Sequence, residues 1–143
     1  MVRLAVEFDE EWGAERFISI EVELTDDLVE FDPATLDVAG RKRFRRQAKL
    51  PHRAIRGWAT ISWKSEQDRE RCIVDQSDRG RWRRVRRHIR KIRHGVMQPG
   101  GPVYLHPSIT CGDKLRPIDG TRRLMACLEL AIPRIPVVVL VAA

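Results

Sequence analysis

The sequence predicts an α+β protein that combines several short strands with helices. Two segments near the start of the chain alternate apolar and polar residues, as half-buried strands do. A later segment repeats apolar residues at helical spacing, and the last third reads as short strands around one helix. A chain of 143 residues is about one domain long, so we expect one compact domain.

The alternating segments are VRLAVEF (residues 2–8) and FISIEVEL (residues 17–24). The acidic loop DEEWGAER lies between them, so we expect the two strands to form a hairpin. Two later stretches, WATISW (residues 58–63) and RCIVD (residues 71–75), read as short strands or connectors. These four segments, together with short strands in the last third, supply the predicted sheet.

A first helix is predicted over residues 33–49. Asp32 is a suitable N-cap, and Pro33 suits the first helical position. Pro51 ends the run, and Gly40 weakens the helix in its middle. We therefore expect a helix of ordinary length that is basic in its second half.

An amphipathic helix is predicted over residues 81–93. Its apolar stripe consists of residues three or four positions apart: Trp82, Val85, Ile89, Ile92 and Val96. Gly95 follows the last turn and ends the helix. The cationic face is the candidate nucleic-acid surface: Arg83, Arg84, Arg86, Arg87, Arg90, Lys91 and Arg93. His88 falls on this charged face, where we expect it to be solvated. Close like charges repel one another, which favours an anionic partner.

The last third predicts strands over residues 102–106, 115–118 and 135–141, with a helix over residues 121–131. The final strand, IPVVVLV, does not alternate and is therefore expected to be buried on both faces. The core-facing residues of the helix are Leu124, Cys127, Leu128 and Ala131.

Charge is divided unevenly along the chain. Residues 1–40 carry 12 acidic and 2 basic side chains, whereas residues 41–143 carry 8 acidic and 25 basic ones. A basic excess of this size attracts polyanions such as DNA, mainly through their phosphates and in a salt-dependent way. The alternative is a solvated surface that is partly neutralised when the acidic segment folds back on the basic body.

Several other classes of protein are not indicated. No segment resembles a signal peptide or a transmembrane helix, so we expect a cytoplasmic protein with no membrane partner. Cys72, Cys111 and Cys127 form no C-x-x-C pair, and the histidines show no metal-ligand spacing. Reduced thiols are therefore expected, and no zinc site.

The segment DGTRR opens the predicted helix of the last third. Gly120 lets the backbone approach a phosphate closely, and the helix start favours anions. Thr121 can donate its hydroxyl, while Arg122 and Arg123 can offer planar guanidinium groups to phosphate oxygens. Asp119 could bind magnesium or a ribose hydroxyl. On these residues alone, an ordinary turn with two solvated arginines is an equally good explanation.

The order of motifs in the second half is more specific than any one of them. It runs RHGVMQPGGPVYLHP, then RPIDGTRRLMACLELA, then RIPVVVLV. This order of helix end, strands, G-x-R-R helix start and closing I-P-V strand resembles the ParB/sulfiredoxin-like domain, over about residues 77–141. The resemblance implies a small mixed sheet with flanking helices, which forms a nucleotide-binding core in residues 76–143. Residues 1–75, with their acidic strands and basic helix, would be an N-terminal elaboration packed on this core.

The resemblance also implies a ligand, namely ATP or CTP with Mg²⁺. The residues that would hold its phosphates are Gly120, Thr121, Arg122 and Arg123, and those that would line the neighbouring wall are Gly95, Gln98 and Pro99. His94 and His106 fall near this inferred pocket and are the candidates for a general base. Asp119 is the candidate catalytic or metal-binding carboxylate.

Two features of the sequence differ from the usual pattern of the ParB/sulfiredoxin-like domain. Thr121 stands where sulfiredoxins have their reactive cysteine, which argues against sulfiredoxin chemistry. The sequence ends at Ala143, directly after the last predicted strand, and shows no helix-turn-helix of the kind that partition ParB proteins carry. It is similar in this respect to short plasmid or phage ParB-like proteins, including Osa-type transfer inhibitors, for which ATP hydrolysis and DNA cleavage have been proposed.

Three functional hypotheses follow. The first is a nucleotide-binding ParB-like protein that engages DNA through its basic helix, with magnesium-dependent nuclease or NTPase activity left open. The second is a non-catalytic interaction or inhibitor protein that docks on a protein partner. The third and weaker one is a small-molecule kinase of the same fold, because DGTRR also resembles the Asp-Gly-His-x-Arg loop of free-serine kinases but lacks its histidine.

Overall fold

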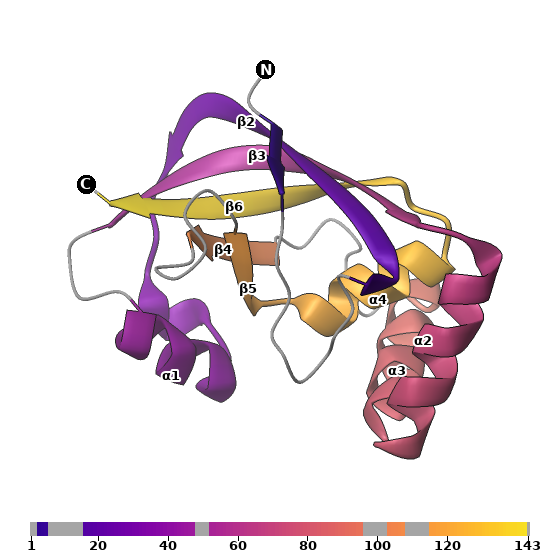
Figure 1. Cartoon of the computed structure of the whole chain (residues 1–143). Helices are drawn as coiled ribbons and strands as arrows, with labels where there is room; N and C mark the ends of the chain where they lie inside the picture. Colours follow the sequence, from indigo (N-terminus) through magenta and orange to yellow (C-terminus); the bar gives the residue numbers. More distant parts are fainter. Residues whose placement is uncertain (1–2, 6–15, 48–51, 96–102, 108–114, 143) are drawn as a thin grey trace.

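The computed structural model describes residues 3–5, 16–47, 52–95, 103–107 and 115–142. In these ranges six strands form one sheet with the order β1-β2-β3-β6-β4-β5, accompanied by helices (Figure 1). The elements are, in chain order, β1 (Arg3–Ala5), β2 (Ile18–Val29), a 3-10 helix (Pro33–Thr35), α1 (Val38–Gln47), β3 (His52–Trp63), α2 (Glu66–Asp78), α3 (Arg81–Arg93), β4 (Val103–Pro107), β5 (Leu115–Asp119), α4 (Thr121–Glu129) and β6 (Arg134–Ala142).

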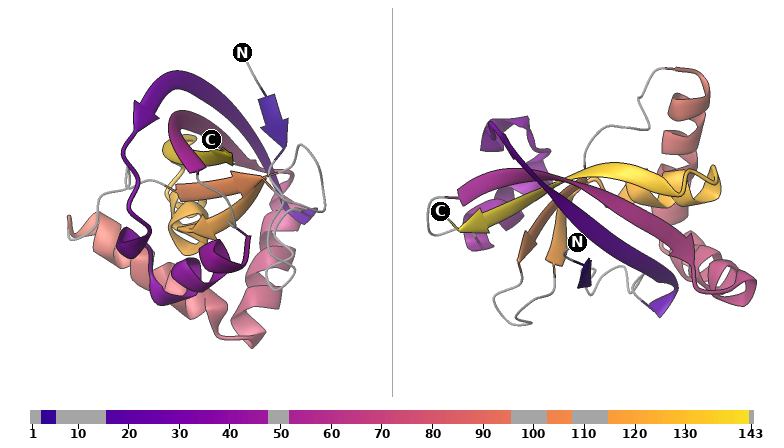
Figure 2. Two further views of the ribbon diagram at one scale, coloured as in Figure 1. Left: turned by 90° about the vertical axis from the view of Figure 1, so that its left-hand side faces the viewer. Right: turned by 90° about the horizontal axis from the view of Figure 1, so that it is seen from above.

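The sheet is mixed. The long strands β2, β3 and β6 pair antiparallel with one another, whereas β4 runs parallel to β6. The predicted α+β class with a mixed sheet and flanking helices is confirmed, and so is the antiparallel pairing of the two N-terminal strands. Figure 2 shows the three long strands crossing the molecule, with α1 at one end and α2 and α3 at the other.

Two apolar clusters lie on the sheet. The larger one joins β2, β3, β4 and β6 to α2, α3 and α4, and the smaller one lies against α1 and the 3-10 helix. Neighbouring residues of β6 belong to different clusters: Val137 and Val139 to the larger, Val138 and Leu140 to the smaller. Because both faces of β6 are covered, its sequence is apolar without alternation, as predicted.

Helix α3 agrees with the predicted bounds. Trp82 and Val85 are buried in the larger cluster, and Ile89 and Ile92 pack against it while half-buried. Val96, the last member of the predicted stripe, lies outside the described residues. The helix starts after Gly80, which adopts a left-handed conformation.

The prediction of a strand or connector over residues 71–75 is wrong, because these residues belong to α2. The Ser65 side chain accepts a hydrogen bond from the N–H of Asp68 and thereby caps the helix start. Cys72 and Gln76, four positions apart, are the buried residues of α2. A face so narrow gives a weak periodic signal, and the short apolar run around Cys72 resembles a strand instead.

The predicted helix over residues 33–49 is divided into the 3-10 helix and α1. Asp32 caps the first of these, since its side chain accepts from the N–H of Ala34. The last predicted helix is shorter than expected: it ends at Glu129, and Ala131 is exposed with a φ of +55° rather than facing the core.

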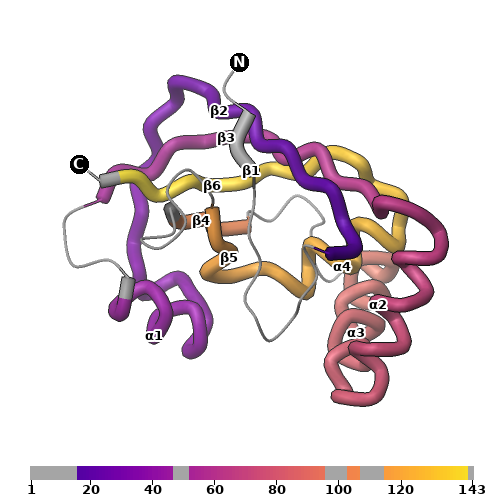
Figure 3. The backbone as a smooth tube through the Cα atoms, in the orientation of Figure 1, coloured from indigo at the N-terminus to yellow at the C-terminus, as the bar shows by residue number. Residues whose placement is uncertain are grey.

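In the part that the structure describes, the acidic segment reaches the basic helix at Asp37, which lines a pocket together with His88. β2 packs against β1 and β3, whereas α3 packs against α2 and α4. Figure 3 shows that β2 runs along the sheet, whereas α3 lies below the end of the sheet opposite α1. In the described ranges, no helix has both the length and the apolar character needed to cross a membrane.

Candidate functional site

Helix α4 begins at the predicted phosphate loop. Gly120 occupies its N-cap with a φ of +95°, a left-handed conformation that favours glycine. A Cβ atom at this position would lie 3.2 Å from the Cα and a side-chain carbon of Val103, so the narrow space also favours glycine. Within the described residues no side chain caps the helix, which leaves its first-turn N–H groups for an anion.

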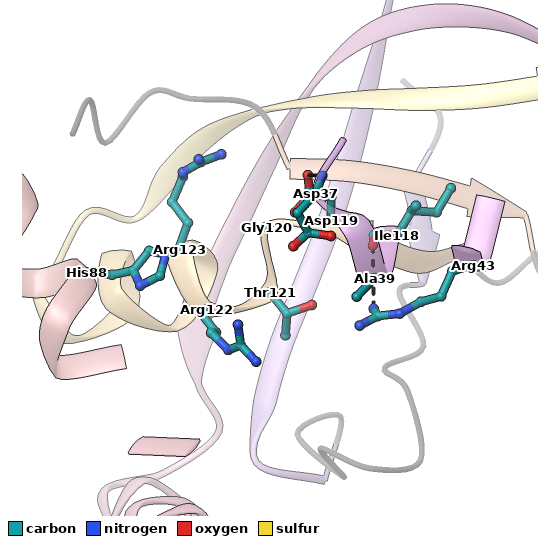
Figure 4. A pocket seen from close by; sticks show the side chains of 10 residues that line it. All are labelled: Asp37, Ala39, Arg43, His88, Ile118, Asp119, Gly120, Thr121, Arg122 and Arg123. Atoms are coloured by element: carbon teal, nitrogen blue, oxygen red, sulfur yellow. Dashed lines mark hydrogen bonds between the residues drawn. The ribbon is translucent and has the colours of Figure 1, made fainter. Parts of the chain in front are cut away.

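A pocket opens at this helix start, between α1 and α4 (Figure 4). The residues around it come from α1 and the segment before it, α3, β5 and α4: Asp37, Ala39, Arg43, His88, Ile118, Asp119, Gly120, Thr121, Arg122 and Arg123. The structure therefore brings together all five residues of the DGTRR motif. It adds Asp37, Arg43 and His88, which sequence reasoning did not place there.

The pocket concentrates positive charge. The guanidinium groups of Arg122 and Arg43 extend into the space beside Thr121, whereas Arg123 extends away from it in Figure 4. Burial lowers the pKa of Arg122, and the positive charges of Arg84, Arg43 and Arg81 lower it further against the opposing effect of Asp37. The Nε atom of Arg122 is buried without a hydrogen-bond partner in the described part of the chain. An anion in the pocket would pair with the buried charge of Arg122 and could accept a hydrogen bond from its Nε atom, which would offset both unfavourable effects.

Two carboxylates form the opposite side of the pocket. Oδ2 of Asp119 accepts a hydrogen bond from the N–H of Asp37, and Oδ1 of Asp37 accepts one from the N–H of Gly40. Burial raises the pKa of Asp119, and the nearby negative charge of Asp37 raises it as well. The described residues contain no group of three or more His, Cys, Asp or Glu side chains that could hold a metal ion. Two carboxylates nevertheless suit Mg²⁺, which commonly takes one or two of them together with phosphate oxygens.

His88 lies in this pocket and is half-buried, so the expectation of a solvated side chain is not met. Its Nδ1 lies 2.9 Å from the carbonyl oxygen of Arg84. Because a carbonyl oxygen can only accept, Nδ1 carries the proton and Nε2 of the neutral ring is left as a proton acceptor. Burial lowers the pKa of His88, and the charges of Arg123, Lys91 and Arg122 lower it further. These effects favour the neutral ring that a general base requires.

The other predicted pocket residues lie elsewhere. His94 is exposed at the end of α3, and Gly95 follows it with a φ of +71°; neither lines the pocket. Gln98 and Pro99 lie outside the described residues. His106 is buried in β4, where its Nε2 lies 2.9 Å from Nε2 of His52. His88 thus replaces His94 and His106 as the histidine of the site, and only the α3–α4 packing reveals it.

The seven predicted nucleic-acid-binding residues are all exposed on α3, but they face different neighbours. Arg86, Arg90 and Arg93 line a groove together with Arg69 and Glu129. Arg69 forms a two-pronged ion pair with Glu129, with N–O distances of 2.8 and 2.9 Å. Arg84 and Lys91 instead act on the pocket side, where their charges affect Arg122 and His88.

The cysteines of the described ranges behave as predicted. Cys72 and Cys127 are free and buried, and burial raises the pKa of both thiols, that of Cys72 to about 12. Cys111 lies outside the described residues.

Comparison with protein-family models, with curated proteins and with solved structures finds no match to this chain. The resemblance to the ParB/sulfiredoxin-like domain therefore stays a prediction that depends on the order of the motifs.

Proposed function

We propose that this chain binds nucleotide phosphates at the start of α4 and engages DNA through the basic face of α3, as a ParB-like protein of plasmid or phage type. The observation that carries the proposal is the convergence of Arg43, Arg122 and the uncapped first turn of α4 on one pocket. Helix starts and arginine forks are the usual means of holding phosphates. ATP and CTP, each with Mg²⁺, are the ligands to test.

Hydrolysis of the bound nucleotide needs a group that activates water. The proposal assigns this role to Nε2 of His88, since Nδ1 is occupied by the carbonyl of Arg84. Asp37 and Asp119 would hold the Mg²⁺ that accompanies the phosphates. That ion would neutralise charge on the phosphate oxygens, while Arg122 would orient them.

Isothermal titration calorimetry of the full chain with ATP and CTP in the presence of Mg²⁺ tests the binding step. Arg122→Ala should weaken the affinity about tenfold or more, because a hydrogen bond to a charged group contributes about 1.5–3 kcal/mol. Arg71→Ala is the matched control, since Arg71 is exposed on α2 and does not line the pocket. No heat from either nucleotide would rule out the nucleotide-binding proposal.

The second candidate is a non-catalytic interaction protein, and an exposed acidic strand favours it. Glu23, Asp26, Asp27 and Glu30 are exposed on or directly after β2. Asp27 and Glu30 border a groove of about 460 Å³ that contains Trp58, whose exposed fraction is 39%. Such a surface suits a basic protein partner.

Deleting residues 1–40 would not test this candidate, because the deletion removes Phe17, Ile18 and Val22 from the core. Asp27→Lys with Glu30→Lys is the cleaner change, because both residues are exposed and line the groove. If the chain is a non-catalytic interaction protein, the double variant should lose the effect that the protein has in the cell, whereas the Arg122→Ala variant should keep that effect. The opposite pattern would favour the phosphate site.

A further inference from the structure

The phosphate pocket continues directly into one side of α3. Arg81, Arg84, His88 and Lys91 are spaced three, four and three residues apart, so they form one row along the helix. We refer to these four residues as the α3 row. Helix α3 packs against α4, and His88 lines the same pocket as Arg122 and Arg123. The α3 row therefore meets the pocket at His88, with Arg81 and Arg84 before that residue and Lys91 after it.

Electrostatic effects show the same continuity. The positive charges of Arg84 and Arg81 lower the pKa of Arg122, and the charge of Lys91 lowers the pKa of His88. These effects require proximity, because exposed charges are screened within about 10 Å at ordinary salt. The α3 row and the pocket therefore form one continuous region of positive charge that an anion can approach.

The size of the pocket limits what enters it. Its volume is about 90 Å³, whereas pockets that enclose a whole small molecule measure roughly 300–1,000 Å³. One phosphate group fits this space, and the rest of any nucleotide would lie outside it. Outside, Arg84 and Arg81 lie four and seven residues before His88, which is about 6 and 10 Å along a helix, the axial length of about two and three nucleotides in one strand.

We propose that the pocket and the α3 row form one site for the end of a nucleic-acid strand, with the terminal phosphate in the pocket and the next backbone phosphates on Arg84 and Arg81. This inference rests on the proposed function and names its ligand more narrowly. A terminal phosphate carries about two negative charges near neutral pH, whereas a phosphodiester carries one. Arg43, Arg122 and the first-turn N–H groups of α4 suit the more highly charged group.

Fluorescence anisotropy with labelled single-stranded oligonucleotides of one sequence tests the inference. The oligonucleotides carry a 5′-phosphate, a 3′-phosphate or only hydroxyl ends, and the full chain is titrated at fixed salt. One of the two phosphorylated oligonucleotides is expected to bind about tenfold more tightly than the hydroxyl form. The reason is that its terminal phosphate accepts charge-assisted hydrogen bonds that the hydroxyl end does not make. Excess inorganic phosphate should remove that gain, because it competes for the pocket alone.

Variants separate the pocket from the row. Arg122→Ala should abolish the preference for the phosphorylated end, and Arg122→Lys should restore part of it because the charge is kept without the planar fork. Arg84→Ala should weaken the phosphorylated and hydroxyl forms by similar factors, because Arg84 is exposed and contacts a backbone phosphate that both forms carry. The matched control is Arg71→Ala, and circular dichroism of each variant verifies its fold.

The outcomes distinguish the inference from the proposed function. Equal affinity for all three oligonucleotides, with ATP or CTP still bound in calorimetry, overturns the strand-end inference and leaves nucleotide binding standing. A phosphorylated-end preference that survives Arg122→Ala also overturns it. If the full chain binds neither nucleotide and none of the oligonucleotides, both the strand-end inference and the proposed function are ruled out.

Discussion

The backbone N–H of Asp37 donates a hydrogen bond to Oδ2 of Asp119, with 3.3 Å between nitrogen and oxygen. This bond joins the segment before α1 to the last residue of β5, although the two are 82 positions apart. It also places two carboxylates together in a pocket whose other charged side chains are cationic (Figure 4). The contact therefore affects both the stability of the fold and the charge of the site.

Asp119→Asn should stabilise the protein at neutral pH. Burial and the charge of Asp37 raise the pKa of Asp119, so its contribution to stability is complete below the ordinary carboxyl pKa and is lost as pH rises through the raised value. Asparagine removes the charge and keeps an oxygen acceptor for the N–H of Asp37. We expect a melting temperature higher by a few degrees at about pH 7 and nearly unchanged at about pH 3.

Thermal unfolding followed by circular dichroism at both pH values measures this effect. Asp78→Asn, an exposed change at the end of α2, is the control for altered net charge. A lower melting temperature of Asp119→Asn at neutral pH would contradict the prediction.

Gly120→Ala should cost more stability than Gly80→Ala. Both glycines precede a helix with positive φ, +95° and +70° respectively. A Cβ at Gly120 would lie 3.2 Å from backbone and side-chain carbons of Val103, whereas a Cβ at Gly80 would meet nothing within 4 Å. The left-handed conformation alone costs about 1–2 kcal/mol, so Gly80→Ala should stay near that figure and Gly120→Ala should exceed it.

Urea denaturation of the two variants gives the free energies of unfolding directly. Equal losses for the two changes would mean that Val103 moves aside at no cost.

Charge reversal on the groove side of α3 should reduce the salt dependence of DNA binding. Arg86 and Arg90 are exposed beside the ion pair of Arg69 with Glu129. If each contacts one phosphate, Arg86→Glu with Arg90→Glu should reduce the slope of log K against log salt by about 1.8 on duplex DNA, since each phosphate contact contributes about 0.9.

The matched control is Arg53→Glu with Arg71→Glu, two exposed arginines of β3 and α2. The affinity is measured by anisotropy at four or more salt concentrations. An equal loss of slope in the control would show that only net charge matters and would remove the assignment of a DNA surface to α3.

Cys72 should resist thiol reagents in the folded protein. Burial, supported by the charge of Asp75, raises the pKa of its thiol to about 12, so almost no thiolate forms near pH 8. In a Cys111→Ser background, Ellman's reagent should label neither Cys72 nor the buried Cys127 until denaturant is added. Labelling of a full equivalent within minutes under native conditions would show that the core around α2 opens readily.

Much of the fold could be predicted where one strong pattern covered a whole element. The spacing of Trp82, Val85, Ile89 and Ile92 predicted α3, and the apolar run of β6 predicted a strand with two covered faces. The α2 helix was missed because its buried face consists of only Cys72 and Gln76. A pattern of two residues does not distinguish a helix from a connector.

The sequence by itself determined the strand-to-helix turn of the DGTRR segment, its two arginines and the basic face of α3, because each depends on residues close together in the chain. Only the tertiary structure decided that Asp37, Arg43 and His88 join this segment in one pocket. It also decided that the acidic strand pairs with β3 while α3 packs on α2 and α4. The physical reason is that such contacts arise when separate elements bury their apolar faces together, and a periodic pattern shows which face is buried but not which partner covers it.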